Sequence, residues 1–371
     1  MASHTPTGLI SRVADRCFWF GRYVERSESS ARVLQTTLSL ALDAELSPRQ
    51  CWQPVVMVSG EEATFLGRMG DAAFEDGEAV QRYLVWDHDC PVSLYQSVGA
   101  GRENARSIRE VLSSDVWETV NELYLWFAGG EARREYGHEN GHGGQRDGFY
   151  RRIRQSAQLT LGLLRSTMLH DTALDFTWLG VLLERVGQTA RLLDVHHYAL
   201  TAGGRAHHVI ETSVWLALLR ACSGVEPFMK THGGRVTGAA VAGFLLGHPR
   251  FPRSIAYCVH SAHERLAAIR RPEDRDLPGG VSLERLGALD AWVRALDRTP
   301  EPAELHTILT HVVDETAAIC DTIAHELLGY EPVVTQTPDA SQSQSSGSSQ
   351  SQSQSQSSGA SQSQSQSSGE P

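Results

Sequence analysis

Helical periodicity over long, unbroken runs limits this chain more than any other feature of its sequence. From Leu9 to about Glu45, apolar residues return at the 3.6-residue spacing of an amphipathic helix, and no proline interrupts them. Further long runs extend from about Phe149 to Leu169, from Thr172 to Leu200 and over 302–328. No stretch alternates apolar and polar residues as a half-buried strand does. We therefore predict an all-α fold, an elongated helical bundle.

Shorter helices are expected near 60–69, 77–85, 91–112, 113–127, 209–222, 236–246, 252–269 and 281–297. Pro48 and Pro54 are expected to break the chain after the first long helix. The glycine-rich stretch 129–148 is expected to be a loop between two possible halves, 9–128 and 149–330.

That glycine-rich stretch contains two overlapping Glu-x-x-His steps, formed by Glu135, His138, Glu139 and His142. Di-iron bundles use this step, but on long core helices that are joined by further glutamate ligands. The surrounding glycines favour a solvated loop. We therefore expect neither a metal site nor a bound cofactor.

The two ends of the chain are expected to lie outside a helical domain that covers 9–330. Residues 1–8 are predicted to be flexible. The Ser/Gln-rich tail, 331–371, has too few apolar residues to fold and is predicted to be disordered.

The composition excludes several classes of protein. The chain has 371 residues, a formal charge of −11 and no basic block, which argues against a nucleic-acid partner. No run of eighteen apolar residues and no secretory signal is present, so we expect no membrane partner. The six cysteines form no CxxC pair and are expected to be single buried thiols in the cytoplasm. Lys230 is the only lysine, so an anion would be held mainly by arginine, helix N-termini or metal.

One sequence pattern occurs twice. Gly, Glu-Arg, Ala-Arg and Leu recur in the same register over 21–34 and 180–193, at an offset of 159 residues. Looser echoes follow over 102–106 and 263–266. This recurrence indicates two related bundle halves.

Helical spacing places the polar residues of this pattern on one face. Glu25 and Arg32 are seven residues apart, two helical turns, with Ser29 between them. Glu184 and Arg191 repeat that arrangement. If the two helices pack together, these groups form either ion pairs that fix the register of the bundle or a polar channel for a carboxylate, a phosphate or a peptide. The spacing leaves both interpretations open.

Several blocks of the chain resemble the bacterial alpha-E domain family, in family order and over about 9–329. The blocks are 11–15, 19–28, 102–110, 114–118, 149–153, 179–194 and 251–255. The chain departs from the family at Val181, where a Gly-Arg pair is common, and at Ser27 and Ser29, where Ala and Asn are usual. A pocket that is symmetric in its arginines is therefore not expected.

The resemblance implies an all-helical protein encoded beside a circularly permuted ATP-grasp ligase, and often beside a transglutaminase-like protease. Such a set makes or modifies a peptide or an amide-linked metabolite. Because this chain has no phosphate-binding glycine loop and no strand-borne lysines, we expect it to be the non-catalytic partner of the ligase.

The candidate residues for binding a carboxylate-bearing peptide or amino-acid substrate, or a partner loop, come from three parts of the chain. They are Arg22, Glu25, Arg26, Glu28 and Arg32, then Glu184, Arg185 and Arg191, with Asn104 and Arg106 as a third element. Two alternatives remain. The chain is an enzyme acting on the ligase product, with Glu25 or Glu184 as acid/base, or it is a structural adaptor.

Overall fold

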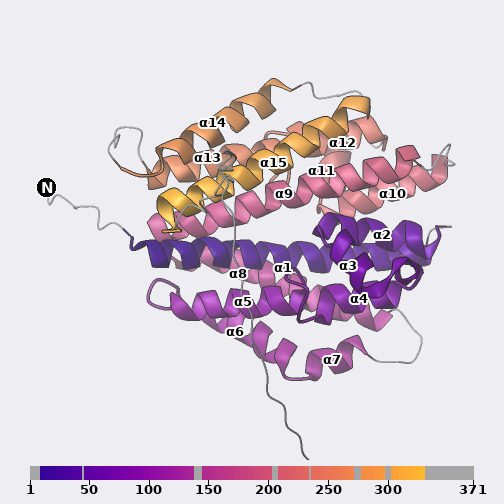
Figure 1. Ribbon diagram of the computed structural model, residues 1–371, viewed down its shortest axis with the longest axis horizontal. Coiled ribbons are helices and arrows are strands. Elements are labelled where there is room, and N and C mark those ends of the chain that lie inside the picture. The colour runs from indigo at the N-terminus through magenta and orange to yellow at the C-terminus, as the bar shows by residue number, and fades with distance from the viewer. Residues whose placement is uncertain are drawn as a thin grey trace, which may run out of the picture. The chain divides into compact units, whose positions relative to one another are not determined.

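The protein is described by a computed structural model over residues 9–43, 46–137, 144–202, 208–233, 235–270, 277–296 and 302–330. Within these ranges the chain forms fifteen α-helices, one short 3-10 helix and no strand (Figure 1). The all-α prediction is therefore confirmed. The predictions for 1–8, for the tail 331–371 and for His138, Glu139 and His142 concern residues outside these ranges.

The helices follow one another along the chain in this order: α1 (Ser11–Asp43), α2 (Pro48–Ser59), α3 (Glu62–Met69), η1 (Asp71–Glu75), α4 (Gly77–Trp86), α5 (Leu94–Ser107), α6 (Ser114–Ala128), α7 (Glu131–Tyr136), α8 (Gly144–Thr167), α9 (Thr172–Ala202), α10 (His208–Ala221), α11 (Val225–His232), α12 (Gly238–Gly247), α13 (Ile255–Ile269), α14 (Gly280–Ala295) and α15 (Pro302–Leu327).

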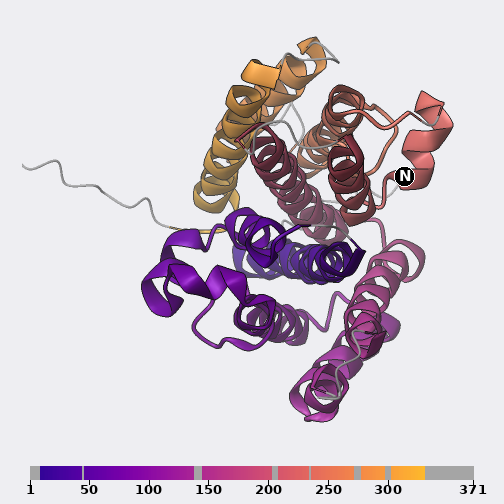
Figure 2. The ribbon, with the colours of Figure 1, turned by 90° about the vertical axis from the view of Figure 1, so that its right-hand side faces the viewer.

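Two long helices, α1 and α9, form the centre of the helical unit. They lie side by side (Figures 1 and 2) and pack along much of their length. The residues that meet have numbers that rise together on both helices, as Arg22 with Glu184 and Glu25 with Arg185 show, so the two helices run parallel. The two echoed sequence motifs are therefore in direct contact.

The neighbours of these two helices repeat. Helices α5 and α8 pack on α1, while α13 and α15 pack on α9. Ser93 caps α5 and Ser254 caps α13, and each hydroxyl also donates to a carbonyl six residues earlier. The two motif helices therefore share a local environment. The division into related halves, 9–128 and 149–330, stays a prediction.

Glycines allow the close approach of α1 to α9. A Cβ added at Gly21 would lie 2.0 Å from the carbonyl oxygen of Thr177, and one added at Gly180 would lie 2.1 Å from that of Phe18. Each glycine is matched by the other at the 159-residue offset, and so are their two contacts. The backbones can meet at this distance only because neither position carries a side chain.

The structure corrects three predictions about helices. Pro48 begins α2, because a proline in the first turn of a helix costs no hydrogen bond. Pro54 lies inside α2, where the burial of Cys51, Trp52 and Val55 offsets the cost of the proline. The predicted loop 129–148 contains α7, which buries Tyr136 against Trp86, and α8 already begins within it. Helix α11 was not expected.

The core is one continuous cluster of buried aliphatic and aromatic side chains. Cys17, Cys51, Cys90, Cys222 and Cys258 are buried free thiols and Cys320 is half-buried, as the sequence predicts. Among the described helices none has the length and apolar content that crossing a bilayer requires.

Candidate functional site

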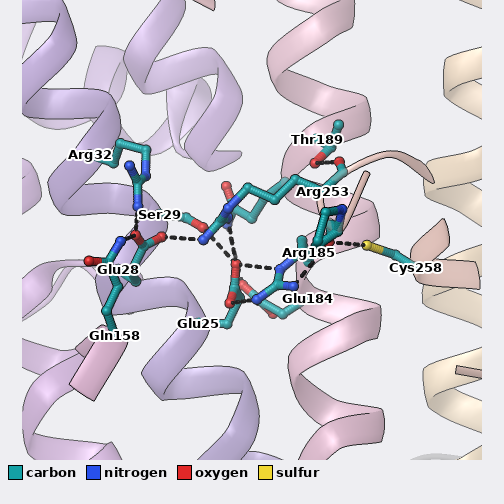
Figure 3. A network of polar contacts seen from close by, with 12 residues as sticks. Glu25, Glu28, Ser29, Arg32, Gln158, Glu184, Arg185, Thr189, Arg253 and Cys258 are labelled. Atoms are coloured by element: carbon teal, nitrogen blue, oxygen red, sulfur yellow. Dashed lines mark hydrogen bonds and ion pairs between the residues drawn. The ribbon is translucent and has the colours of Figure 1, made fainter. Parts of the chain in front are cut away.

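A buried cluster of ion pairs lies where the two motif helices meet. Glu25 of α1 is fully buried and accepts two hydrogen bonds from Arg185 of α9, at 2.9 Å from Nε and 2.6 Å from Nη2. Arg253, from the turn before α13, adds a third at 2.8 Å, and Figure 3 shows both arginines converging on this carboxylate. Glu25 is thus held by two guanidinium groups from outside its own helix.

Glu184 of α9 is held in the same way, by arginines of α1. Arg26 donates to it through Nε at 2.7 Å and Nη2 at 2.9 Å, and Arg22 donates through Nε at 2.9 Å. Each Glu-Arg pair therefore gives its arginine to the glutamate of the other pair. This exchange is what a local two-fold axis between parallel helices produces.

Glu28 is the third buried carboxylate of the cluster. It accepts a hydrogen bond of 2.6 Å from Arg253 and one of 3.1 Å from Gln158, and it forms an ion pair with Arg32. Arg253 therefore joins Glu25 to Glu28 (Figure 3).

These contacts keep the carboxylates charged. Burial by itself raises the pKa of Glu25, but Arg185 and Arg253 outweigh it and the pKa is lowered. For Glu184 burial is again opposed by Arg26 and Arg22, and the pKa is also lowered. Neither carboxyl group therefore carries a proton near neutral pH.

A cavity of about 150 Å³ opens beside Glu184. Its polar wall consists of Arg22, Arg26, Ser30, Glu184, Gln188 and Arg191. Its other wall consists of Val33, Leu34, Val55, Val58, Leu84 and Val92, together with Ser59, from α1, α2, α4 and the turn before α5. The hydroxyl of Ser59 donates to the carbonyl of Val56. The cavity therefore has one charged side and one mainly aliphatic side.

Arg191 is the arginine of this wall that lacks a matching carboxylate. Its Nε is buried without a hydrogen-bond partner among the described residues. Burial, together with the charges of Arg26 and Arg22, lowers the pKa of Arg191 against the opposite effect of Glu184. Three guanidinium groups thus share one carboxylate around the cavity, which leaves room for one more anionic group.

The structure brings eight of the ten predicted residues together and leaves two outside. Asn104 of α5 is buried, accepts from Arg16 at 3.2 Å and donates to the carbonyl of Ala100. Arg106 is exposed and pairs with Glu103. The expected third element is therefore not part of the cluster.

The sequence analysis did not select Arg253 as a site residue. This arginine lies 228 positions from Glu25 in the chain, and no helical spacing relates the two. The available signal was the pair of serine-capped turns, Pro91-Val92-Ser93 and Pro252-Arg253-Ser254, which differ in charge at their middle position.

In the described part of the chain, no three His, Cys, Asp or Glu side chains gather as metal ligands. The acids of the cluster already bind arginine. What the site offers is recognition of an anion by guanidinium groups.

Comparison with known proteins gives a family and distant relatives. The family model Alpha-E, described as a predicted alpha-helical domain with a conserved ER motif, matches residues 9–328. An uncharacterized protein of Mycobacterium bovis and one of Mycobacterium tuberculosis are each 28% identical over 319 residues, which covers 80% of this chain and 33% of theirs. The chain therefore spans about a third of the length of these relatives. No solved structure matches it.

Proposed function

This chain belongs to the Alpha-E family, and we propose that it is the non-catalytic partner of an ATP-grasp ligase in bacterial peptide or amide-bond synthesis. In this proposal the cavity beside Glu184 holds a carboxylate-bearing substrate for the ligase. The Glu-Arg pairs that give the family its motif hold α1 and α9 in register, and the arginines on the cavity side provide the binding groups.

One observation carries the binding role. Arg22, Arg26 and Arg191 face a cavity in which Glu184 is the one carboxylate among the described lining residues, and Glu184 already accepts hydrogen bonds from the first two. A buried guanidinium without a counter-charge is costly, and a bound carboxylate would supply that charge.

The relatives are consistent with a chain that works beside other domains. About two thirds of each mycobacterial protein lies outside the matched region, so the helical domain there is joined to further sequence. A helical module of this kind fits a role as a substrate holder beside a catalytic unit.

The alternative of a stand-alone acid/base enzyme receives less support. Glu184 is the glutamate that lines the cavity, but Arg22, Arg26 and Gln188 occupy its oxygens and its pKa is lowered. A general acid needs a proton to donate near neutral pH, and this group has none.

The proposal is tested by measuring ATP turnover and product mass of the neighbouring ATP-grasp ligase, with and without this chain, over a panel of amino acids and peptides. We expect product to require the chain and Arg191→Gln to lower product formation by about tenfold or more, since a charge-assisted contact to the substrate is lost. Circular dichroism of Arg191→Gln controls for folding.

Full ligase activity without this chain, together with failure of the two proteins to co-purify, would contradict the proposal. A separate enzyme acting on the product of the ligase would then be the better description.

A further inference from the structure

Two charged side chains that stand beside Glu25 have no counterpart beside Glu184: Glu28 of α1 and Arg253 of the turn before α13. At the 159-residue offset, Glu28 of α1 corresponds to Gly187 of α9, and Arg32 corresponds to Arg191. Arg32 forms an ion pair with Glu28, one helical turn away, although its Nε, like that of Arg191, has no hydrogen-bond partner among the described residues. The residue one helical turn before Arg191 is Gly187, which has no side chain to pair with it.

The second difference lies in the capped turns. Arg253 stands directly before the capping Ser254 of α13 and reaches Glu25 and Glu28. Val92 stands directly before the capping Ser93 of α5 and lines the cavity. The two corresponding positions around Glu184 therefore carry less side-chain volume, with no side chain at Gly187 and valine at Val92, and a space of about 150 Å³ lies beside Val92 and Arg191.

We infer that this cavity binds an N-acylated α-amino acid with a small branched aliphatic side chain, such as the C-terminal residue of a peptide, whose carboxylate takes the role toward Arg191 that Glu28 has toward Arg32. This inference rests on the proposed function of the cavity as a carboxylate site.

The charge of the wall selects against a free amino acid. Three guanidinium groups surround one carboxylate that already accepts from Arg22, Arg26 and Gln188. An α-ammonium group would stand within this positive field, whereas the amide of an acylated amino acid carries no charge. The hydroxyl of Ser30 lies in the same wall and offers an acceptor to an amide N–H.

The other wall selects the side chain. Six of its seven residues are valine or leucine, and the hydroxyl of the seventh, Ser59, already donates to the carbonyl of Val56, so the wall offers mainly aliphatic contact. A cavity of about 150 Å³ is comparable with one that holds benzene, which leaves room for a valine-sized group next to a carboxylate.

The site can be closed from within the protein. A Cβ at Gly187 would have the Nη2 of Arg191 as its nearest neighbour, at 3.6 Å, so a Cβ fits there without a clash. Gly187→Glu would place a carboxylate one turn before Arg191, as Glu28 stands before Arg32. Gly187→Gln is the matched control, equal in size and without charge.

The experiment measures binding of N-acetyl-L-valine to the full chain by isothermal titration and by the shift in melting temperature. We expect binding to the wild type, about tenfold or more weaker binding to Arg191→Gln, and none to Gly187→Glu. We also expect Gly187→Glu to melt at a higher temperature than Gly187→Gln, because the new carboxylate pairs with Arg191. The tripeptide Ala-Ala-Val, tested beside N-acetyl-L-valine, shows whether longer peptides enter.

Any one of four results would overturn the inference. Equal binding of N-acetyl-L-valinamide would show that the carboxylate of the ligand is not recognised. Equal binding of free L-valine would show that the site does not prefer an acylated nitrogen. Unchanged binding by Gly187→Glu would show that the ligand binds elsewhere. Absence of binding at millimolar concentration, with equal melting of the Glu and Gln variants, would also overturn it. If ligand binding behaves as expected while the ligase does not need this chain, the inference stands and the proposed function fails.

Discussion

At the scale of single residues, the buried carboxylates carry the largest expected effects on stability. Glu25→Gln would leave Arg185 and Arg253 buried beside a neutral amide. We expect a loss of about 3–5 kcal/mol in the free energy of unfolding, measured by urea denaturation, because an unpaired buried charge is costly. The control is Glu103→Gln, which removes exposed pairs with Arg102 and Arg106 and should cost less than about 1 kcal/mol. Equal effects of the two substitutions would mean that the buried pairs do not stabilise the fold.

The same carboxylates set a dependence of stability on pH. The pKa values of Glu25 and Glu184 are lowered in the folded protein and lie near 4.3 in the unfolded chain. Their contribution is therefore complete above about pH 5 and is lost as the pH falls toward the folded-state values. We expect the free energy of unfolding to fall steeply below about pH 4, and Glu184→Gln to reduce that slope. Denaturation curves between pH 3 and pH 7 test this, and a slope unchanged in Glu184→Gln would contradict it.

At the scale of elements, the packing of α1 on α9 depends on glycine. Gly180→Ala would force its Cβ into the carbonyl oxygen of Phe18, so the helices would have to separate. We expect a loss of about 3 kcal/mol or more, or failure to fold. Gly162→Ala is the matched control on α8, where a Cβ meets nothing within 4 Å, and should stabilise by about 0.5–1 kcal/mol. Thermal melting of both variants decides the point, and a Gly180→Ala protein as stable as Gly162→Ala would contradict the packing.

Periodicity predicted the long helices well and failed where local residues mislead. Helices α1 and α9 follow from their apolar spacing, whereas the prolines Pro48 and Pro54 predict a break where the structure has α2. Tertiary burial of Trp52 offsets that local cost. At the candidate site, helical faces grouped Glu25 with its neighbours, but Arg253 reaches the cluster only through the fold. Spacing within a helix cannot reveal a contact made by a distant turn.

At the scale of the whole molecule, the bonds that hold the candidate site together cross between two parts of the chain. Glu25 needs Arg185, Glu184 needs Arg26, and Gly21 and Gly180 each contact the backbone of the other helix. A mutation on α9 therefore acts on the electrostatics of α1, and the cavity exists only when the two helices are docked. The charged cluster and the cavity are in this sense one cooperative unit.

This arrangement predicts how the chain behaves when it is divided. A cut in the short turn between α8 and α9, giving fragments 9–169 and 170–330, breaks no helix but separates every one of these pairs. Each fragment alone would expose buried carboxylates and guanidinium groups together with the apolar face of a central helix. We expect each to lack a cooperative thermal transition, and co-expressed fragments to assemble and regain one, as followed by circular dichroism. If either fragment alone melted like the intact chain, each half would have a complete core of its own, and the exchanged Glu-Arg pairs would join two finished domains rather than complete one.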